Sequence, residues 1–116
     1  MEARAISKYV RQSPRKMRLV IDLIRGRSVG EAYALLQYSK KRAAESIDKT
    51  LRSAVANARA KAEASGELVD VDDLYVKEAY VNEGPRLKRW RAAAQGRPAP
   101  IRRPTSHVVI VVDRKD

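Results

Sequence analysis

Between residues 86 and 103 the chain carries seven positively charged side chains and no negatively charged one. Like charges at this density repel one another, and a charge without an acidic partner is costly to bury. The segment therefore cannot belong to a hydrophobic core, and it is too long for an ordinary loop inside a compact domain. We predict that residues 84–104 form a basic arm whose order depends on a polyanionic partner.

The whole chain shares this excess of positive charge. Its 116 residues fit a single domain, residues 1–116, and they hold 25 Lys and Arg against 14 Asp and Glu, a formal net charge of +11. Nucleic acid is the commonest partner for such a charge, followed by an anionic membrane surface. Cysteine is absent, and the longest apolar run, Val108 to Val112, is too short to cross a membrane. We expect a cytoplasmic protein with no membrane partner.

The charge is unevenly distributed along the sequence. Residues 67–85 hold six acidic side chains and one basic one, and they directly precede the arm, which has no acid. This contrast predicts that one side of the molecule faces a polyanion while another faces water.

Two helices are predicted before residue 40. Ser13 and Pro14 supply an N-cap and a first-turn proline, and Gly26 is placed to end the first helix. Ser28 and Glu31 have the spacing of a capping box at the start of a short second helix. The apolar residues of the first helix recur at helical spacing: Met17, Val20, Ile21 and Ile24.

A long helix and three strands complete the expected domain. Apolar side chains at helical spacing predict the helix from about Lys41 to Ala64. Strands are predicted at about 3–10, 74–83 and 105–113. The last is rich in β-branched residues and lacks alternation, which is typical of a strand covered on both faces.

Cations also gather around the start of the first helix, at Arg11, Arg15, Lys16 and Arg18. A helix N-terminus presents free N–H groups and a positive dipole end, so a phosphate bound there would relieve the conflict between these cations and the dipole. The alternative is a solvated basic face. The same two interpretations apply to the short basic run 40–42.

Within the arm, six of the seven cations are arginine, which suits bidentate contact with phosphate. Trp90 could stack on an unpaired base, or it could anchor the base of the arm hydrophobically. Pro98, Pro100 and Pro104 lack an N–H, so strand pairing near the tip is expected to be interrupted.

Signatures of catalysis or metal binding are missing. The sequence has no phosphate-binding glycine-rich loop and no nucleophile elbow, and its single histidine, His107, has no cysteine or second histidine as a co-ligand. Asp70, Asp72 and Asp73 are followed by no calcium-loop pattern. We expect no enzyme activity, no cofactor, no metal and no small-molecule substrate.

Four motifs in order resemble one known family, the bacterial large-subunit ribosomal protein L-twenty-two. They are Ser13–Val20 with Asp22–Gly26, Ser53–Ala58, Val81–Pro85 with Leu87–Arg89, and Thr105–His107. The resemblance covers nearly the whole chain. It implies an α+β fold, with three helices packed on a small three-stranded antiparallel sheet and a long extended β-hairpin arm.

The resemblance also implies a function. The chain would be a ribosome-bound structural constituent of the large subunit that binds large-subunit rRNA, supports assembly and contacts neighbouring ribosomal proteins. Its arm would reach the wall of the polypeptide exit tunnel, close to the nascent polypeptide and to bound macrolides.

Residues for each role follow from the motifs and the charge. The expected rRNA-binding residues are Arg11, Ser13, Arg15, Lys16, Arg18, Arg25, Lys40, Lys41, Arg86, Lys88, Arg89, Trp90, Arg91, Arg97, Arg102, Arg103, Thr105, Ser106 and His107. The expected tunnel-lining residues are Leu87, Lys88, Arg89, Trp90, Arg91, Ala92, Ala93, Ala94, Gln95 and Gly96.

Three rival functions share part of this pattern. A histone-like, DNA-compacting protein would have the same charge and a basic arm, but it usually needs an apolar dimer interface. A small RNA-processing enzyme would need a lysine or His107 as its base. A membrane-surface protein would need an apolar helix face that the predicted core already uses.

Overall fold

The computed structural model describes residues 2–85, 87–92 and 98–114, and between 87 and 103 it describes the backbone alone. In chain order the elements are β1 (Ala3–Val10), α1 (Pro14–Ile24), α2 (Val29–Tyr38), α3 (Ala43–Ala64), the 3-10 turn η1 (Val71–Asp73), β2 (Leu74–Glu83), β3 (Leu87–Ala92), β4 (Pro98–Arg103) and β5 (Ser106–Arg114). The predicted helices and strands of the domain are confirmed. Where the sequence predicted a first or last residue, the observed one lies within two residues of it.

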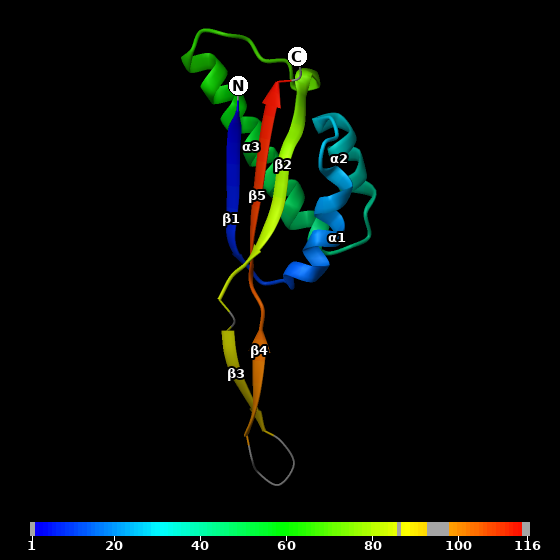
Figure 1. The fold of residues 1–116 in the computed structure, drawn as a ribbon, viewed down its shortest axis with the longest axis vertical. Coiled ribbons are helices and arrows are strands. Elements are labelled where there is room, and N and C mark those ends of the chain that lie inside the picture. The colour runs from blue at the N-terminus through cyan, green and yellow to red at the C-terminus, as the bar shows by residue number, and fades with distance from the viewer. Residues whose placement is uncertain (1, 86, 93–97, 115–116) are drawn as a thin grey trace.

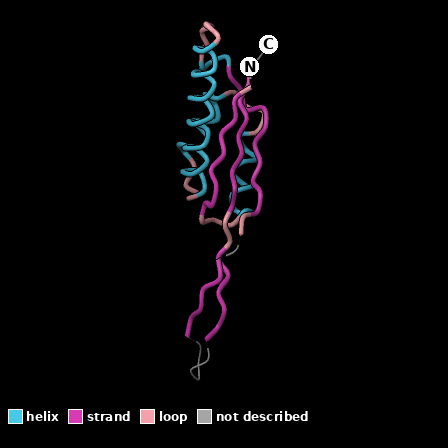
Figure 2. Tube along the Cα trace, turned by 90° about the vertical axis from the view of Figure 1, so that its left-hand side faces the viewer, coloured by secondary structure: helices cyan, strands magenta, loops and turns pink. Residues whose placement is uncertain are grey.

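The domain has two layers. An antiparallel sheet in the order β1–β5–β2 forms one layer, and α1, α2 and α3 form the other. Figure 2 shows the long helix α3 along one side of the sheet, and α1 and α2 pack against β2 as part of the same core. The opposite face, here called the open face, carries no second layer among the described residues. The predicted α+β class is therefore confirmed. No helix in the described part of the chain is long and apolar enough to cross a membrane.

The core lies between the sheet and the helices. Its largest fully buried side chains come from both layers and include Met17, Ile21, Ile24, Ile47, Leu51, Leu74, Ile110, Val76, Val108 and Val112. The sequence builds this core without phenylalanine. Alanines at 54 and 58 on α3 are fully buried, and their small side chains allow the helix to approach the sheet closely.

The central strand β5 is buried on both faces, as its sequence predicts, although in the described part of the chain no second layer covers its open face. Val109 and Val111 point to the open face and are nonetheless only 4% and 7% exposed. In the register, Val109 lies between Ile6 of β1 and Tyr80 of β2. The larger side chains of the two edge strands therefore shield the central valines.

Below the sheet, β3 and β4 pair as an antiparallel ribbon, the backbone of the arm (Figure 1). The prediction that proline interrupts the strand pairing is wrong at Pro98 and Pro100. Pro98 pairs with Ala92, and Pro100 pairs with Trp90. In a two-stranded ribbon alternate N–H groups point away from the partner strand. Pro98 and Pro100 are two residues apart and share one orientation, so the ladder tolerates both.

Candidate nucleic-acid interface

The arm leaves the domain at a junction, here called the arm root, where β1, β2 and β5 are joined by side chains. The hydroxyl of Ser106 donates to the carbonyl oxygen of Gln12 at 2.6 Å. The hydroxyl of Thr105 donates to the carbonyl oxygen of Pro85 at 2.5 Å. The amide of Gly84 donates to the Thr105 carbonyl oxygen at 2.9 Å. Thr105 and Ser106, which the sequence placed among the RNA contacts, are buried. Their hydroxyls fix the direction in which the arm leaves.

Exposed cations surround the arm root. The side-chain amide of Gln12 lies 3.5 Å from the carbonyl oxygen of Arg42, so the loop before α3 reaches the turn before α1. This contact brings the basic run 40–42 next to the turn before α1. The exposed cations of these two segments and of the end of β1 are here called the root surface: Lys8, Arg11, Arg15, Lys16, Lys40, Lys41 and Arg42. Among the described residues, none of these seven forms an ion pair with an acidic side chain. Their charge is therefore available to a ligand.

Two helices begin at this end of the domain. The first residues of α1 and α3 lie toward the arm, whereas α2 begins farther up, beside β2 (Figure 1). Neither Ser13 before α1 nor Arg42 before α3 caps its helix with a side-chain hydrogen bond, although Ser13 was the predicted cap. Ser28 does cap α2, accepting from the Glu31 amide at 3.3 Å. The two uncapped N-termini add positive potential to the root surface.

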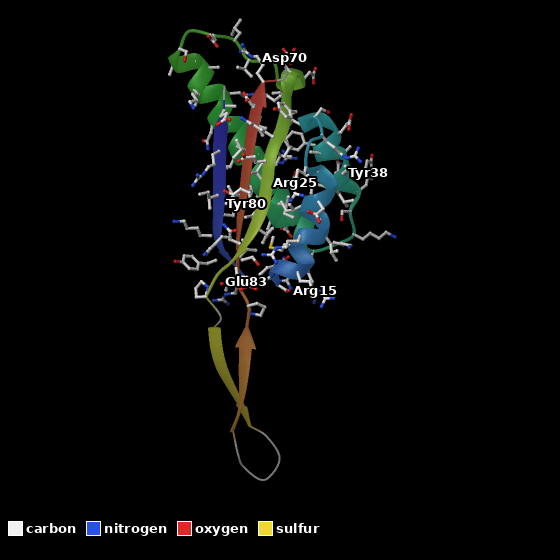
Figure 3. The ribbon with its side chains drawn as sticks, in the orientation of Figure 1. Arg15, Arg25, Tyr38, Asp70, Tyr80 and Glu83 are labelled. Carbon is white, nitrogen blue, oxygen red and sulfur yellow. The ribbon has the colours of Figure 1, made fainter. Side chains whose placement is uncertain are left out.

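Acidic side chains occupy the opposite end of the domain. Figure 3 places Asp70 at the end away from the arm and Arg15 near the arm. The Asp70 carboxylate accepts a hydrogen bond from the Asp72 amide at 3.0 Å, so it caps η1. Within the described residues, no group of three or more His, Asp or Glu side chains is arranged to hold a metal ion. The acidic segment 70–73 thus lies at the end opposite the arm root, while Glu83 lies near the arm (Figure 3).

Two of the expected RNA-binding arginines are bound to the sheet. The guanidinium of Arg18 donates to the carbonyl oxygen of Val81 at 3.2 and 2.9 Å. The guanidinium of Arg25 donates to the carbonyl oxygen of Ala79 at 3.0 and 2.7 Å. Arg25 also pairs with Asp22 at 2.9 Å. The carbonyls belong to the outer edge of β2, which among the described residues pairs with no further strand and only with residues 26–28 near its start. The two arginines therefore attach α1 to the sheet and cover an edge that would otherwise remain unpaired.

Sequence reasoning missed Tyr9, at the end of β1. Its backbone has φ of +59°, in the left-handed region, which costs a non-glycine residue about 1–2 kcal/mol. The register between β1 and β5 shifts between Ser7 and Val10, and this bulge creates the unusual conformation. His107 holds it, because Nδ1 accepts a hydrogen bond from the Tyr9 amide at 3.1 Å.

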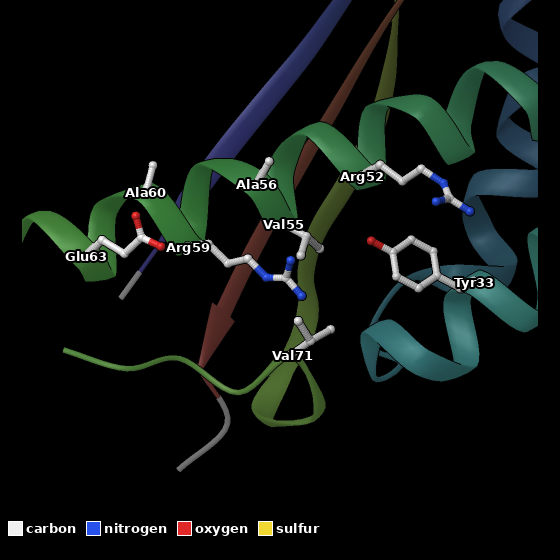
Figure 4. Close-up of a pocket in the computed structure, with 8 residues that line it drawn as sticks. All are labelled: Tyr33, Arg52, Val55, Ala56, Arg59, Ala60, Glu63 and Val71. Atoms are coloured by element: carbon white, nitrogen blue, oxygen red, sulfur yellow. The ribbon is translucent and has the colours of Figure 1, made fainter.

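A groove lies between α2, α3 and η1, away from the arm root. It has a volume of about 490 Å³ and is lined by Tyr33, Arg52, Val55, Ala56, Arg59, Ala60, Glu63 and Val71 (Figure 4). Arg52 lies over the Tyr33 ring, 5.3 Å from its centroid, and pairs with Asp48. Burial raises the pKa of Tyr33, with a smaller opposing effect of the Arg52 charge. The Arg52 guanidinium is thus already engaged within the protein.

The remaining expected contacts lie in the arm. Arg86 and the tip residues 93–97 fall outside the described residues, and β3 and β4 place the backbones of 87–92 and 98–103 side by side. Those two strands carry Lys88, Arg89, Arg91, Arg102 and Arg103. The arm thus continues the basic root surface away from the acidic end.

Comparison with known proteins identifies the family. The model of the family "Ribosomal protein L22p/L17e" matches residues 5–113. Proteins named large ribosomal subunit protein uL22 are 52% identical over 116 residues in Bifidobacterium longum (strain DJO10A), covering 100% of this chain and 98% of the relative, and 54% identical over 115 residues in Halothermothrix orenii, covering 99% and 97%. In Syntrophus aciditrophicus the identity is 48% over 115 residues, covering 99% and 100%. The chain therefore belongs to the ribosomal protein L22p/L17e family, whose members are structural proteins of the ribosome and not enzymes.

Proposed function

We propose that this protein is a structural constituent of the large ribosomal subunit that binds large-subunit rRNA through its root surface and its arm. The acidic end of the domain would then face away from the RNA. Neighbouring ribosomal proteins would contact the surfaces that the RNA leaves free, and early binding of the protein would support assembly of the subunit.

One observation carries this proposal: the seven exposed cations of the root surface, which have no acidic partner among the described residues, lie in the segments that lead into two helices without a side-chain cap. In the free protein these charges repel each other and oppose the helix dipoles. A phosphate backbone reverses both effects, and each phosphate that is neutralised releases counterions. RNA therefore completes an arrangement that is unfavourable without it.

Binding to purified large-subunit rRNA at several salt concentrations tests the proposal. We expect affinity to fall steeply with salt, and Arg15→Gln to lower the slope of log affinity against log salt by about one. The matched control is Arg59→Gln, since Arg59 is also exposed, helical and, among the described residues, without an ion pair. It should leave the slope unchanged. Equal slopes for all three proteins would remove the root surface from the RNA interface.

Sedimentation tests the place of the protein in the cell. In a sucrose gradient of native lysate, near-stoichiometric co-migration with the large subunit at moderate salt is expected. A pool found on chromatin, with none on the large subunit, would favour the DNA-compacting alternative instead.

We further infer that residues 87–96 line the polypeptide exit tunnel, as the family resemblance implies. The long β3–β4 ribbon, with cations on both strands, fits an arm that passes between RNA segments. A photoactivatable side chain at Gln95 in assembled subunits should cross-link to a radiolabelled nascent chain stalled on the ribosome. The same group at Gln37, on the exposed side of α2, is the control and should not. Absence of a nascent-chain cross-link from position 95 would contradict the tunnel assignment.

A further inference from the structure

Tyr9 is held in a strained backbone conformation, and the residue is 63% exposed. Strained residues persist only where the surroundings determine them, and they gather at functional sites. The exposed ring gains little from burial within this chain. Burial in the core therefore does not explain why the chain tolerates the strain.

The position of the ring is nonetheless fixed. The Tyr9 amide is hydrogen-bonded to His107 Nδ1, and the two rings meet edge to face, with centroids 5.1 Å apart and planes at 86°. Gly84 leaves the room that His107 needs, because a Cβ at residue 84 would lie 3.2 Å from His107 Cε1. Three segments that are distant in sequence thus cooperate to hold one aromatic ring outward.

The surface beside Tyr9 combines aromatic, apolar and basic side chains. The bulge lies next to the pairs of Ile6 with Val109 and of Tyr80 with Val109, and both Ile6 and Tyr80 expose more than a third of their surface. Figure 3 shows Tyr80 on the open face of the sheet. Lys8 directly precedes Tyr9 in the chain and Arg11 follows it by two residues, and both are exposed. Phosphates near these cations would bring a nucleotide within reach of the ring.

We propose that Tyr9 is a stacking platform for an unpaired base of RNA, with Lys8 and Arg11 binding the adjacent phosphates. Aromatic side chains beside cations are the usual means by which proteins hold unpaired bases. This inference rests on the proposed RNA-binding function and adds a contact of a different kind. It means that the arm root recognises a base that is splayed out of the helix, and not the phosphate backbone alone.

Two RNA probes separate stacking from charge. The full-length protein is titrated into a fluorescein-labelled oligoadenylate of ten nucleotides and into an abasic strand of the same length, with anisotropy as the readout. We expect Tyr9→Ala to weaken binding to the oligoadenylate about 5-fold or more. It should leave binding to the abasic strand unchanged, because the phosphates remain.

Control variants make the result specific to the ring. Tyr9→Phe keeps the ring and should bind the oligoadenylate within about twofold of the unmodified protein. Tyr38→Ala removes another exposed tyrosine, on α2, and should have no effect. Thermal unfolding checks that each variant is folded.

Three outcomes would contradict the stacking inference or the proposed function on which it rests. If Tyr9→Ala binds the oligoadenylate as tightly as the unmodified protein while the salt dependence stands, the stacking inference fails and the proposed function survives. If Tyr9→Ala weakens binding to both strands equally, the ring acts on backbone binding and the inference also fails. If the unmodified protein binds neither strand nor rRNA, the proposed function itself is overturned.

Discussion

The guanidinium of Arg25 lies 2.7 Å from the carbonyl oxygen of Ala79, and both its Nε and its Nη2 donate to that single oxygen. Seven residues earlier, Arg18 makes the same pair of contacts with Val81. Arg18 and Arg25 are seven residues apart, which is two turns of α1, so both lie on the same face of the helix. Ala79 and Val81 are two residues apart, so their carbonyl groups point to the same edge of β2, and each arginine lies opposite one of them. These cations stabilise the domain even without RNA.

Replacing either arginine by lysine should therefore destabilise the fold. The ammonium keeps the charge but cannot reproduce the two fixed N–H donors, so we expect Arg18→Lys and Arg25→Lys each to lower the free energy of unfolding by about 1 kcal/mol. Urea unfolding followed by circular dichroism measures this. Arg59→Lys is the control and should be neutral. Unchanged stability in both variants would mean that the sheet edge does not depend on these contacts.

Gly84→Ala tests the packing of the arm root. The new Cβ would lie 2.5 Å from the hydroxyl oxygen of Thr105, which is itself bound to Pro85. We expect the free energy of unfolding to fall by about 1–3 kcal/mol, because this contact cannot be accommodated without moving the junction.

A second glycine provides the control for this substitution. A Cβ at Gly30 would meet nothing within 4 Å, and the residue lies in the first turn of α2. Gly30→Ala should therefore be neutral or gain up to about 1 kcal/mol from helix propensity. Similar losses at both positions in the same urea assay would contradict the steric explanation.

Most of the domain could be predicted from sequence because its signals are local. Gly26, with φ of +80°, ends the first helix where expected, and Ser28 caps the second. The strand β5 was visible in its run of β-branched residues. The basic arm was visible because no acidic residue interrupts it.

The rest of the site depends on contacts between distant segments. Tyr9 and His107 are 98 residues apart, and the bulge that strains Tyr9 arises only when β1 pairs with β5. Likewise, Arg18 and Arg25 look like any exposed cations until the edge of β2 is placed beside α1. The motif that contains Thr105 and Ser106 likewise gives no sign that both residues are buried and that their hydroxyls bind the carbonyl oxygens of Pro85 and Gln12.

The unequal capping of the helices leads to a paired prediction. The Ser28 hydroxyl accepts from the Glu31 amide, whereas the Ser13 side chain makes no capping hydrogen bond. Ser28→Ala should therefore lower the free energy of unfolding by about 0.5–2 kcal/mol. Ser13→Ala should change it by less than about 0.5 kcal/mol. If Ser13→Ala proves as costly as Ser28→Ala, the N-terminus of α1 is capped in solution and offers less to a phosphate.

Stability at high pH should depend on Tyr33. Desolvation between α2 and α3 raises its pKa above the ordinary value of 10.0, although the nearby Arg52 charge opposes this shift. The folded state therefore favours the protonated phenol. This contribution to stability is fully present below about pH 10 and is lost as the pH rises through the higher pKa of the folded state.

Tyr33→Phe isolates the contribution of this phenol from that of the lysines, which titrate in the same range. It keeps the ring beneath Arg52 but removes the titrating hydroxyl, so we expect its free energy of unfolding to fall less steeply between pH 9 and 11. Urea unfolding across this range measures the difference, and absorbance at 295 nm follows the phenolate directly. Tyr38→Phe is the control, because Tyr38 is 82% exposed. Parallel pH profiles for Tyr33→Phe and the unmodified protein would show that the groove does not desolvate Tyr33 in solution.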